Sequence, residues 1–435
     1  MEYTFDELWL KALYVMEKTS ENLFLTWKAW TWKSTLLHSF IANTRKRAIV
    51  LAPTGVAALN AWGATIHSFF KFSPKTTLQS IKKSAKYRVG DPLYTCIDTM
   101  VIDEISMVRA DLFDFMDTFL QIVRENKMPF GGVQMVMIGD LFQLPPVVTT
   151  DEKVVLQKLW YKSPYFFSSK VMKNKKFSFI YHELQNIYRQ SDQDFISFLN
   201  TVREGKSTLE NINRFNQKVA NSEVILEPWD IYLAGKNAIV DDFNQTKLEE
   251  LPTDTVPYFA TILGQVSQSV FPTNEILELK VASQVMFVSN DPAGRRVNGT
   301  LWLVIGLQDN NVSVSLFWWG VVQVEAFTRK INQYVYNEEA QKFETITVGS
   351  FKQIPLKLAW ACTIHKSQGK TFDRVILDFQ GGIFAHGQAY VALSRCKTMQ
   401  GIALTRPLKP SDFILDHEVL QFLESAKKHT IQSLF

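Results

Sequence analysis

The chain has 435 residues, which exceeds one ordinary hydrophobic core and predicts two to four domains. Apolar residues make up 46% of it, which excludes a disordered or collagen-like protein. The formal net charge of +4 is compatible with nucleic acid binding but does not by itself indicate it. No apolar run reaches the roughly 18 residues of a membrane span, so no membrane partner is expected.

Three cysteines stand far apart in the sequence, in no metal-ligand spacing: Cys96, Cys362 and Cys396. This usage argues against a disulfide framework. It favours an intracellular, reducing compartment, either the cytoplasm or the nucleoid.

The first 140 residues alternate between helical and strand-like patterns. Residues 5–18 carry apolar side chains at helical spacing and predict an opening helix. Short apolar runs typical of buried parallel strands follow at 23–26, 48–52, 100–102 and 133–138, with helical patterns between them at 33–43, 54–61 and 110–125. This alternation predicts βαβ units and a doubly wound parallel sheet, which is the α/β fold class.

The second half predicts another α/β domain with an insertion. Candidate strands lie at 231–234, 357–361, 375–377 and 401–404. Residues 280–355 hold strand-like runs separated by turn signals, which predict a small inserted antiparallel β module. Residues 71–96 are polar and rich in lysine, which predicts a small insertion in the first domain. The expected division is 1–190 for the first domain, 191–290 with 353–435 for the second, and 291–352 for the module.

The strongest local signal is an apolar strand that ends in two adjacent carboxylates, Asp103 and Glu104. Ligands and catalytic groups of open α/β sheets gather at the carboxyl ends of strands. An aspartate there can hold Mg²⁺, and the adjacent glutamate can orient an attacking water. The alternative interpretation is that both carboxylates cap the N-terminus of a helix.

Three other polar segments follow apolar runs. Gln143 could sense a γ-phosphate, or it could be an ordinary loop amide. Polar groups are massed at 365–369 after a candidate strand. Arg395 ends a helix-like stretch and could stabilise phosphoryl charge, although a lone arginine is usually a solvated surface residue.

In order and spacing, these segments resemble the RecD-like and Pif-type DNA helicases of superfamily one. The matching motifs lie at 52–55, 65–68, 103–104, 139–143, 188–190, 365–369 and 392–395, and the resemblance spans roughly residues 20 to 405. It implies two RecA-like doubly wound parallel-sheet domains, with ATP and Mg²⁺ in the cleft between them. It further implies an SH3-like β module inserted in the second domain, a small wedge-bearing insertion at 71–96 and movement from 5′ to 3′.

The resemblance also implies roles for single residues. Asp103 and Ser34 hold Mg²⁺, Glu104 positions water and Gln143 reads the γ-phosphate. Arg189 and Arg395 reach across the cleft from the side of the second domain. The nucleotide site includes Lys33, Ser34, Gln368 and Gly369, whereas single-stranded DNA, the expected partner of a monomeric protein, faces Thr54, His67, Thr363 and His365.

One segment departs from the family at its most diagnostic position. A phosphate loop reads G-x-x-x-x-G-K-[ST], and Lys33 and Ser34 fit that pattern, but both glycine positions are tryptophan, Trp27 and Trp32. Trp30 takes a third position that family members usually give to glycine. The loop needs glycine because its backbone adopts dihedrals that a Cβ disfavours and approaches the phosphate closely. Three indole rings, each of roughly 150–250 Å², have their nearest space in the nucleotide site.

The sequence therefore predicts a non-catalytic DNA-binding scaffold. It should not bind or hydrolyse ATP, so neither ATP nor Mg²⁺ is expected as a cofactor of the chain as written, although intact relatives use both. The alternative is an active ATP-driven 5′ to 3′ DNA helicase, which every motif except the phosphate loop supports. Trp62 and Trp302 also stand where relatives tend to have glycine.

Overall fold

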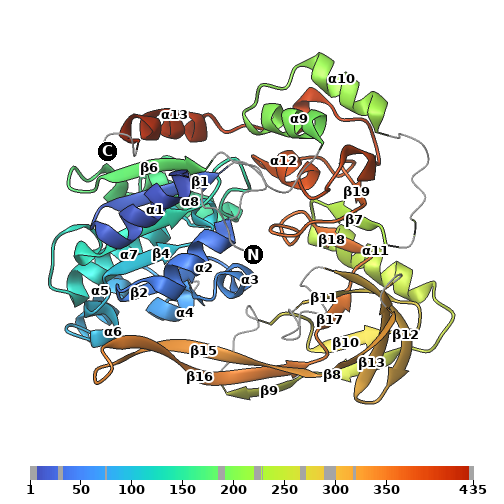
Figure 1. The fold of residues 1–435 in the computed structure, drawn as a ribbon, viewed down its shortest axis with the longest axis horizontal. Coiled ribbons are helices and arrows are strands. Elements are labelled where there is room, and N and C mark those ends of the chain that lie inside the picture. The colour runs from blue at the N-terminus through green and yellow to red at the C-terminus, as the bar shows by residue number, and fades with distance from the viewer. Residues whose placement is uncertain are drawn as a thin grey trace.

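Two α/β domains lie on either side of the molecule, and a β module lies beneath the second one in the view of Figure 1. The structure is a computed structural model that describes residues 7–27, 33–73, 76–184, 192–219, 227, 229–264, 271–288, 300–316 and 320–430. None of the helices in these ranges has the length and apolar character needed to cross a membrane.

The first domain is built on a six-stranded sheet in the order β3-β2-β4-β5-β1-β6. Every strand pair in it is parallel, as the alternating sequence pattern predicted. The strands are β1 (Asn22–Trp27), β2 (Ala48–Ala52), β3 (Ala64–Thr65), β4 (Thr99–Ile102), β5 (Gln134–Ile138) and β6 (Phe179–Leu184). The central strands β4 and β5 are buried along their whole length because the sheet is covered on both faces.

The part of this domain that the structure describes has eight α-helices: α1 (Glu7–Lys18), α2 (Lys33–Asn43), α3 (Gly55–Asn60), α4 (Ile66–Phe70), α5 (Leu78–Lys86), α6 (Pro92–Thr95), α7 (Ala110–Val123) and α8 (Thr150–Lys158). Side chains alternate along β1, so Leu23 and Leu25 join the apolar cluster with α1 and α2, whereas Phe24 joins the cluster on the opposite face with α7. Helices α5 and α6 lie in the insertion expected at 71–96 and pack against α7.

The second domain has a four-stranded parallel sheet in the order β18-β7-β19-β20. Its strands are β7 (Ile231–Ala234), β18 (Ala361–Thr363), β19 (Val375–Leu377) and β20 (Ile402–Leu404), and its helices are α9 (Gln193–Arg203), α10 (Leu209–Lys218), α11 (Asn237–Glu249) and α12 (Gln388–Leu393). The expected strand at 357–361 is wrong in its bounds. The chain pairs with the β module as β17 (Leu356–Leu358), passes Trp360 and joins this sheet only at Ala361.

The β module holds a five-stranded sheet in the order β14-β13-β12-β11-β17. Its other strands are β11 (Gln284–Phe287), β12 (Leu301–Gln308), β13 (Asn311–Leu316) and β14 (Gly320–Glu325). The buried ring of Trp302 lies edge-on to Phe287 inside this module, with ring centroids 5.5 Å apart.

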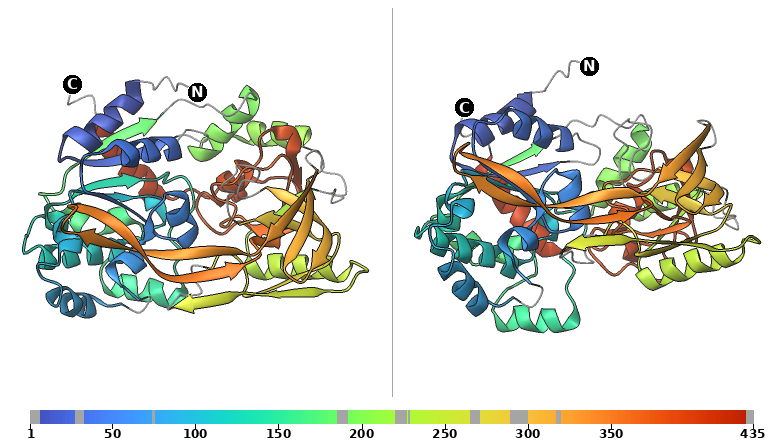
Figure 2. Two further views of the ribbon diagram at one scale, coloured as in Figure 1. Left: turned by 60° about the horizontal axis from the view of Figure 1, so that its bottom comes forward. Right: turned by 90° about the horizontal axis from the view of Figure 1, so that it is seen from below.

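Additional β structure begins before the expected boundary at residue 291. Two short strands pair with each other, β8 (Val256–Phe259) and β10 (Ile276–Leu279), and a further sheet contains β9 (Thr261–Gly264), β15 (Phe327–Asn337) and β16 (Lys342–Gln353). The long β15–β16 hairpin reaches the first domain, as Figures 1 and 2 show. There the Tyr334 ring lies edge-on to Phe69 of α4, at 6.0 Å between centroids.

The last helix, α13 (His417–Ala426), returns to the first domain and lies beside β6 (Figure 1). We expected residues 353–435 to belong to the second domain. Instead, the Phe422 ring stacks on Phe167 at 4.5 Å and also packs against Phe24 and Phe166 at 5.8 Å. The apolar contacts of α13 therefore fasten the end of the chain to the first sheet.

We expect Phe422→Ala to lower the free energy of unfolding of the first domain by about 3 kcal/mol, near the low end for a phenylalanine because the ring is only half-buried. Urea denaturation followed by circular dichroism measures the change. Gln421→Ala, on the exposed side of the same helix, is the matched control and should leave the midpoint unchanged. Equal effects of the two substitutions would show that α13 does not hold the sheet.

Candidate functional site

The carboxyl ends of β1, β4 and β5 meet at one edge of the first sheet. These strands are neighbours and parallel, and the backbone N–H of Gly139, just after β5, donates to the carbonyl of Leu25 in β1 at 3.0 Å. A Cβ at Gly139 would lie 2.7 Å from Cγ2 of Ile105, in the turn that follows β4. Only glycine therefore lets the turn after β4 and the loop after β5 approach this closely.

Asp103 and Glu104 form that turn after β4. Asp103 is 4% exposed, and its Oδ1 accepts a hydrogen bond from the backbone N–H of Glu104 at 2.9 Å. Glu104 adopts a left-handed backbone, with φ 52° and ψ 45°, and its side chain makes no capping bond to the short 3₁₀ helix that follows. This geometry argues against the helix-cap interpretation of Glu104. Non-glycine residues in such a conformation are found disproportionately at functional sites.

The loop after β5 carries Gln143 into contact with the second domain. Nε2 of Gln368 donates to Oε1 of Gln143 at 3.3 Å. A Cβ at Gly387, just before α12, would lie 2.3 Å from the carbonyl oxygen of Phe142, and Nε2 of His386 lies 2.8 Å from the carbonyl oxygen of Leu141. The structure thus brings together two residues, Gln143 and Gln368, that the sequence assigned separately to the nucleotide site.

Arg395 is held inside the second domain. Its guanidinium donates to the carbonyl oxygen of Lys370 at 3.0 Å and to Oγ of Ser394 at 2.8 Å, and its Nε donates to the carbonyl oxygen of Val391 at 2.8 Å. Burial lowers the pKa of Arg395 to about 10, and the carboxylate of Glu104 acts in the opposite direction. Arg395 therefore lies within electrostatic range of Glu104 in the other domain. The second expected arginine, Arg189, lies outside the described residues.

The phosphate-loop segment is described only at its ends. Residues 28–32, with Trp30 and Trp32, lie outside the described ranges, and α2 begins at Lys33, although the side chains of Lys33 and Ser34 are not described. Trp27 ends β1 and is 6% exposed. For this ring the expected placement in the nucleotide site is wrong. Side-chain alternation puts it on the same face as Leu25, in the apolar cluster under α1 and α2.

The residues expected to face DNA lie on both domains. Thr54 caps α3 through its Oγ1, which accepts from the N–H of Ala57 at 3.2 Å. Thr363 is 3% exposed, so its hydroxyl shapes the turn after β18 rather than offering surface. His67 and His365 are half-buried, and burial lowers the pKa of both imidazoles.

Sequence reasoning missed Arg203, the last residue of α9. Its guanidinium donates to the carbonyl oxygen of Trp27 at 2.9 Å and to Oδ1 of Asp140 at 3.2 Å, and it lies over the Phe142 ring at 4.5 Å. Burial raises the pKa of Asp140, and the charge of Arg203 opposes that rise.

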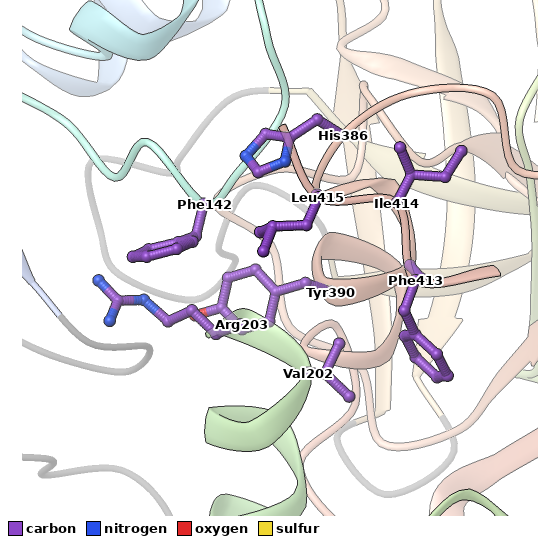
Figure 3. Close-up of a pocket in the computed structure, with 10 residues that line it drawn as sticks. Phe142, Val202, Arg203, His386, Tyr390, Phe413, Ile414 and Leu415 are labelled. Atoms are coloured by element: carbon purple, nitrogen blue, oxygen red, sulfur yellow. The ribbon is translucent and has the colours of Figure 1, made fainter. Parts of the chain in front are cut away.

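Figure 3 shows Arg203 beside Phe142 in a small pocket that both domains line. Asp140 could have been found from its place in the matched segment at 139–143. Arg203 carried no local signal, since its pattern is that of an ordinary amphipathic helix end.

The residues present fit Mg²⁺ and the terminal phosphate better than they fit the rest of ATP. Mg²⁺ is usually bound by one or two carboxylates together with substrate phosphates, and Asp103 supplies such a carboxylate at the strand edge. No cluster of three or more metal-ligating side chains occurs within the described ranges. The loop expected to hold the β-phosphate has tryptophan at its glycine positions in the sequence, and its residues 28–32 lie outside the described ranges.

Two parallel α/β domains that meet over the carboxyl ends of their strands define a helicase fold with RecA-like domains, which confirms the predicted fold class. The sequence profile of PIF1-like helicases matches residues 9–213. The ATP-dependent DNA helicase Pif1 of Bdellovibrio bacteriovorus is 32% identical over 93% of this chain and 88% of its own length. The chain belongs to the Pif1-like helicase family.

Other relatives agree. The human ATP-dependent DNA helicase PIF1 is 34% identical over 95% of this chain, and this chain spans 63% of its length. Pif1 from a Bacteroides species in complex with ADP-AlF4 superposes with a TM-score of 0.86 and 34% identity, covering 99% of both chains. The Bacteroides Pif1 structure bound to single-stranded DNA gives a TM-score of 0.69 at 33% identity over 98% of both chains.

Lys370 is a further unexpected group at this site. It follows Gly369 directly, and its Nζ lies 3.0 Å from Sδ of Met286 in the β module. Burial, with a smaller contribution from the nearby charge of Lys357, lowers the pKa of Lys370 to about 7. The folded chain therefore releases a proton from Lys370 at a pH where the unfolded chain still holds it.

This difference in the Lys370 pKa between the folded and unfolded chain makes the stability of the fold depend on pH. Between pH 7 and the ordinary lysine pKa of 10.5, the unfolded state binds more protons, so the free energy of unfolding should rise with pH. Lys370→Met lacks this contribution, so its stability advantage over the unmodified chain should be largest below pH 7 and shrink as the pH rises. Urea denaturation over that pH range measures it, with Lys352→Met, exposed on β16, as control. A pH-independent difference would contradict the assignment.

Proposed function

We propose that the chain as written binds single-stranded DNA but neither binds nor hydrolyses ATP. The observation that carries the proposal is the replacement of the phosphate-loop glycines by Trp27, Trp30 and Trp32. A phosphate loop wraps the β-phosphate with consecutive backbone N–H groups, and glycine supplies the dihedrals and the close approach. The surviving Lys33 cannot replace that cradle.

The remainder of the site supports a second candidate, an active ATP-driven 5′ to 3′ DNA helicase. Asp103, Glu104 and Gln143 lie at the strand edge, and the contact between Gln143 and Gln368 joins the two domains there. In this candidate Asp103 and Ser34 hold Mg²⁺ and Glu104 positions water. Gln143, Arg189 and Arg395 act on the phosphates, and Lys33, Gln368 and Gly369 contact the nucleotide. The two candidates differ at the phosphate loop.

Single-stranded DNA is the proposed ligand of both candidates, through Thr54, His67 and His365. The buried Thr363 would contribute indirectly, by holding the turn that carries His365. These residues lie on both α/β domains and outside residues 27–32. Stacking and phosphate contacts do not require ATP. We further propose a monomeric, intracellular protein, with residues 291–352 as an SH3-like module.

A fluorescent ATP analogue should not bind the chain as written. We expect Trp27→Gly, Trp30→Gly and Trp32→Gly together to restore binding and DNA-stimulated ATPase, because the loop can then wrap the phosphates. Adding Lys33→Ala should abolish the restored binding. In the restored chain, Glu104→Gln should stop hydrolysis and spare binding.

Because the Trp27 ring packs in the core, the double change at 30 and 32 serves as a second variant if the triple variant is poorly folded by circular dichroism. Comparable ATP turnover by the unmodified chain and the folded restored variants would overturn the proposal.

A labelled single-stranded oligonucleotide should bind the chain as written, with an affinity that falls as salt rises. Fluorescence anisotropy measures binding. The logarithm of the binding constant should fall linearly with the logarithm of the salt concentration, with a slope of about −0.7 for each phosphate neutralised on a single strand. The double variant His67→Ala with His365→Ala should bind more weakly. His417→Ala, exposed on α13, is the matched control. No binding at low salt by folded protein would refute the DNA-binding scaffold.

A further inference from the structure

Three tryptophans have a left-handed backbone, a conformation that favours glycine. The φ angles are 55° at Trp62, 64° at Trp160 and 80° at Trp229. A Cβ is disfavoured there, and a bulky residue with positive φ is a genuine outlier. Seven of the chain's tryptophans fall in the described ranges, so three of seven share a conformation that is rare for any non-glycine residue.

Two of them end helices in the same way. After α8, the N–H of Trp160 donates to the carbonyl of Gln157 at 2.9 Å, and the N–H of Tyr161 donates to that of Leu156 at 3.1 Å. After α3, the N–H of Gly63 donates to the carbonyl of Ala58 at 2.7 Å, so Trp62 takes the corresponding place. These bonds define a Schellman motif, whose left-handed position is usually glycine.

One helix end in the chain carries glycine at this position. After α9 the equivalent position is Gly205, with φ 66°, and the N–H of Lys206 donates to the carbonyl of Thr201 at 2.8 Å. Lys71 and Glu125 show that flexible side chains are tolerated at such positions. A single tryptophan with positive φ is explained by the same tolerance. Tolerance does not explain why tryptophan occupies such a position three times.

Trp229 lies in a turn of a different kind. The N–H of Asp230 donates to the carbonyl of Glu227 at 3.1 Å, which closes a β-turn with Trp229 at its third position. A positive φ at that position is the mark of a type II turn, which calls for glycine. In the sequence a proline precedes Trp229, and proline followed by glycine is the pair that this turn favours.

Burial does not account for the rings of Trp62 and Trp160. Trp160 is 88% exposed and Trp62 is 66% exposed, although the Trp62 ring stacks on His38 at 3.7 Å. By contrast, Trp360 is 7% exposed and belongs to the core. Glycine is also scarce, with 19 of 435 residues against roughly 7% in average usage.

We propose that the native protein carries glycine at positions 27, 30, 32, 62, 160 and 229. On this proposal, each of the six positions is encoded by UGA, a codon that some genetic codes read as tryptophan and others as glycine. The printed sequence then gives tryptophan where the cell inserts glycine. Positions 62, 160 and 229 are assigned by their backbone. Positions 27, 30 and 32 are assigned by the register of the phosphate loop, and this extension rests on the second candidate function, in which that loop holds a nucleotide. The native chain would then match the phosphate-loop pattern in full and take a nucleoside triphosphate.

Peptide mass spectrometry of the protein isolated from its own cells tests the proposal. Peptides that cover the six positions should each be lighter by the difference between tryptophan and glycine, whereas the peptide with Trp360 should keep its tryptophan. In the gene, the six positions should share UGA and Trp360 should be encoded by UGG. Tryptophan in the peptides at 62, 160 and 229 would overturn the proposal, and tryptophan at 27, 30 and 32 alone would overturn its extension to the loop.

A stability comparison tests the backbone argument on the chain as written. Trp160→Gly should raise the urea midpoint above that of Trp160→Ala, because both remove the ring but only glycine removes the Cβ from a left-handed position. An alanine variant as stable as the glycine variant would overturn the assignment at that helix end.

Different results would refute the proposed function and the proposal that the native chain carries glycine. Glycine in the native peptides with no nucleotide binding by that native protein would refute a nucleotide site and leave the sequence inference intact. Tryptophan in the native peptides would refute the sequence inference and leave the ATP-deficient scaffold in place.

Discussion

The buried guanidinium of Arg203 is the interaction on which the arrangement of the site depends. It bonds the carbonyl at the end of β1, the carboxylate of Asp140 after β5 and Glu183 in β6. A buried cation without such partners would be strongly destabilising, so the three strand ends and α9 must keep their places together. The phosphate-loop segment leaves β1 at the residue whose carbonyl Arg203 holds. The start of that loop is therefore fixed from the second domain.

Local sequence pattern predicted most of both parallel sheets. The apolar runs at 48–52 and 231–234 match β2 and β7 in full, because a strand buried on both faces must be apolar at every position. The carboxylate pair at 103–104 was predicted from the same pattern, because polar residues directly after an apolar run mark the carboxyl end of a buried strand. The comparison with known proteins confirmed the expected family.

What the sequence did not predict depends on contacts between distant segments. The chain at 357–361 reads as one strand, yet Leu358 pairs with the module and Ala361 pairs with β7. The role of Arg203 can be recognised only from its contacts with Asp140 and Trp27 in the folded chain. The role of Phe422 likewise depends on the packing of α13 against the aromatic side chains of the first domain. The expected placement of Trp27 is wrong because side chains alternate along β1, which puts its ring in the apolar cluster with Leu25.

The β15–β16 hairpin constrains how far the two halves can separate. Its base is continuous with the module of the second domain, whereas its far part contacts α4 and α6 of the first. Any separation of the two halves would therefore have to break the contacts at the far end of the ribbon or deform the ribbon along its length.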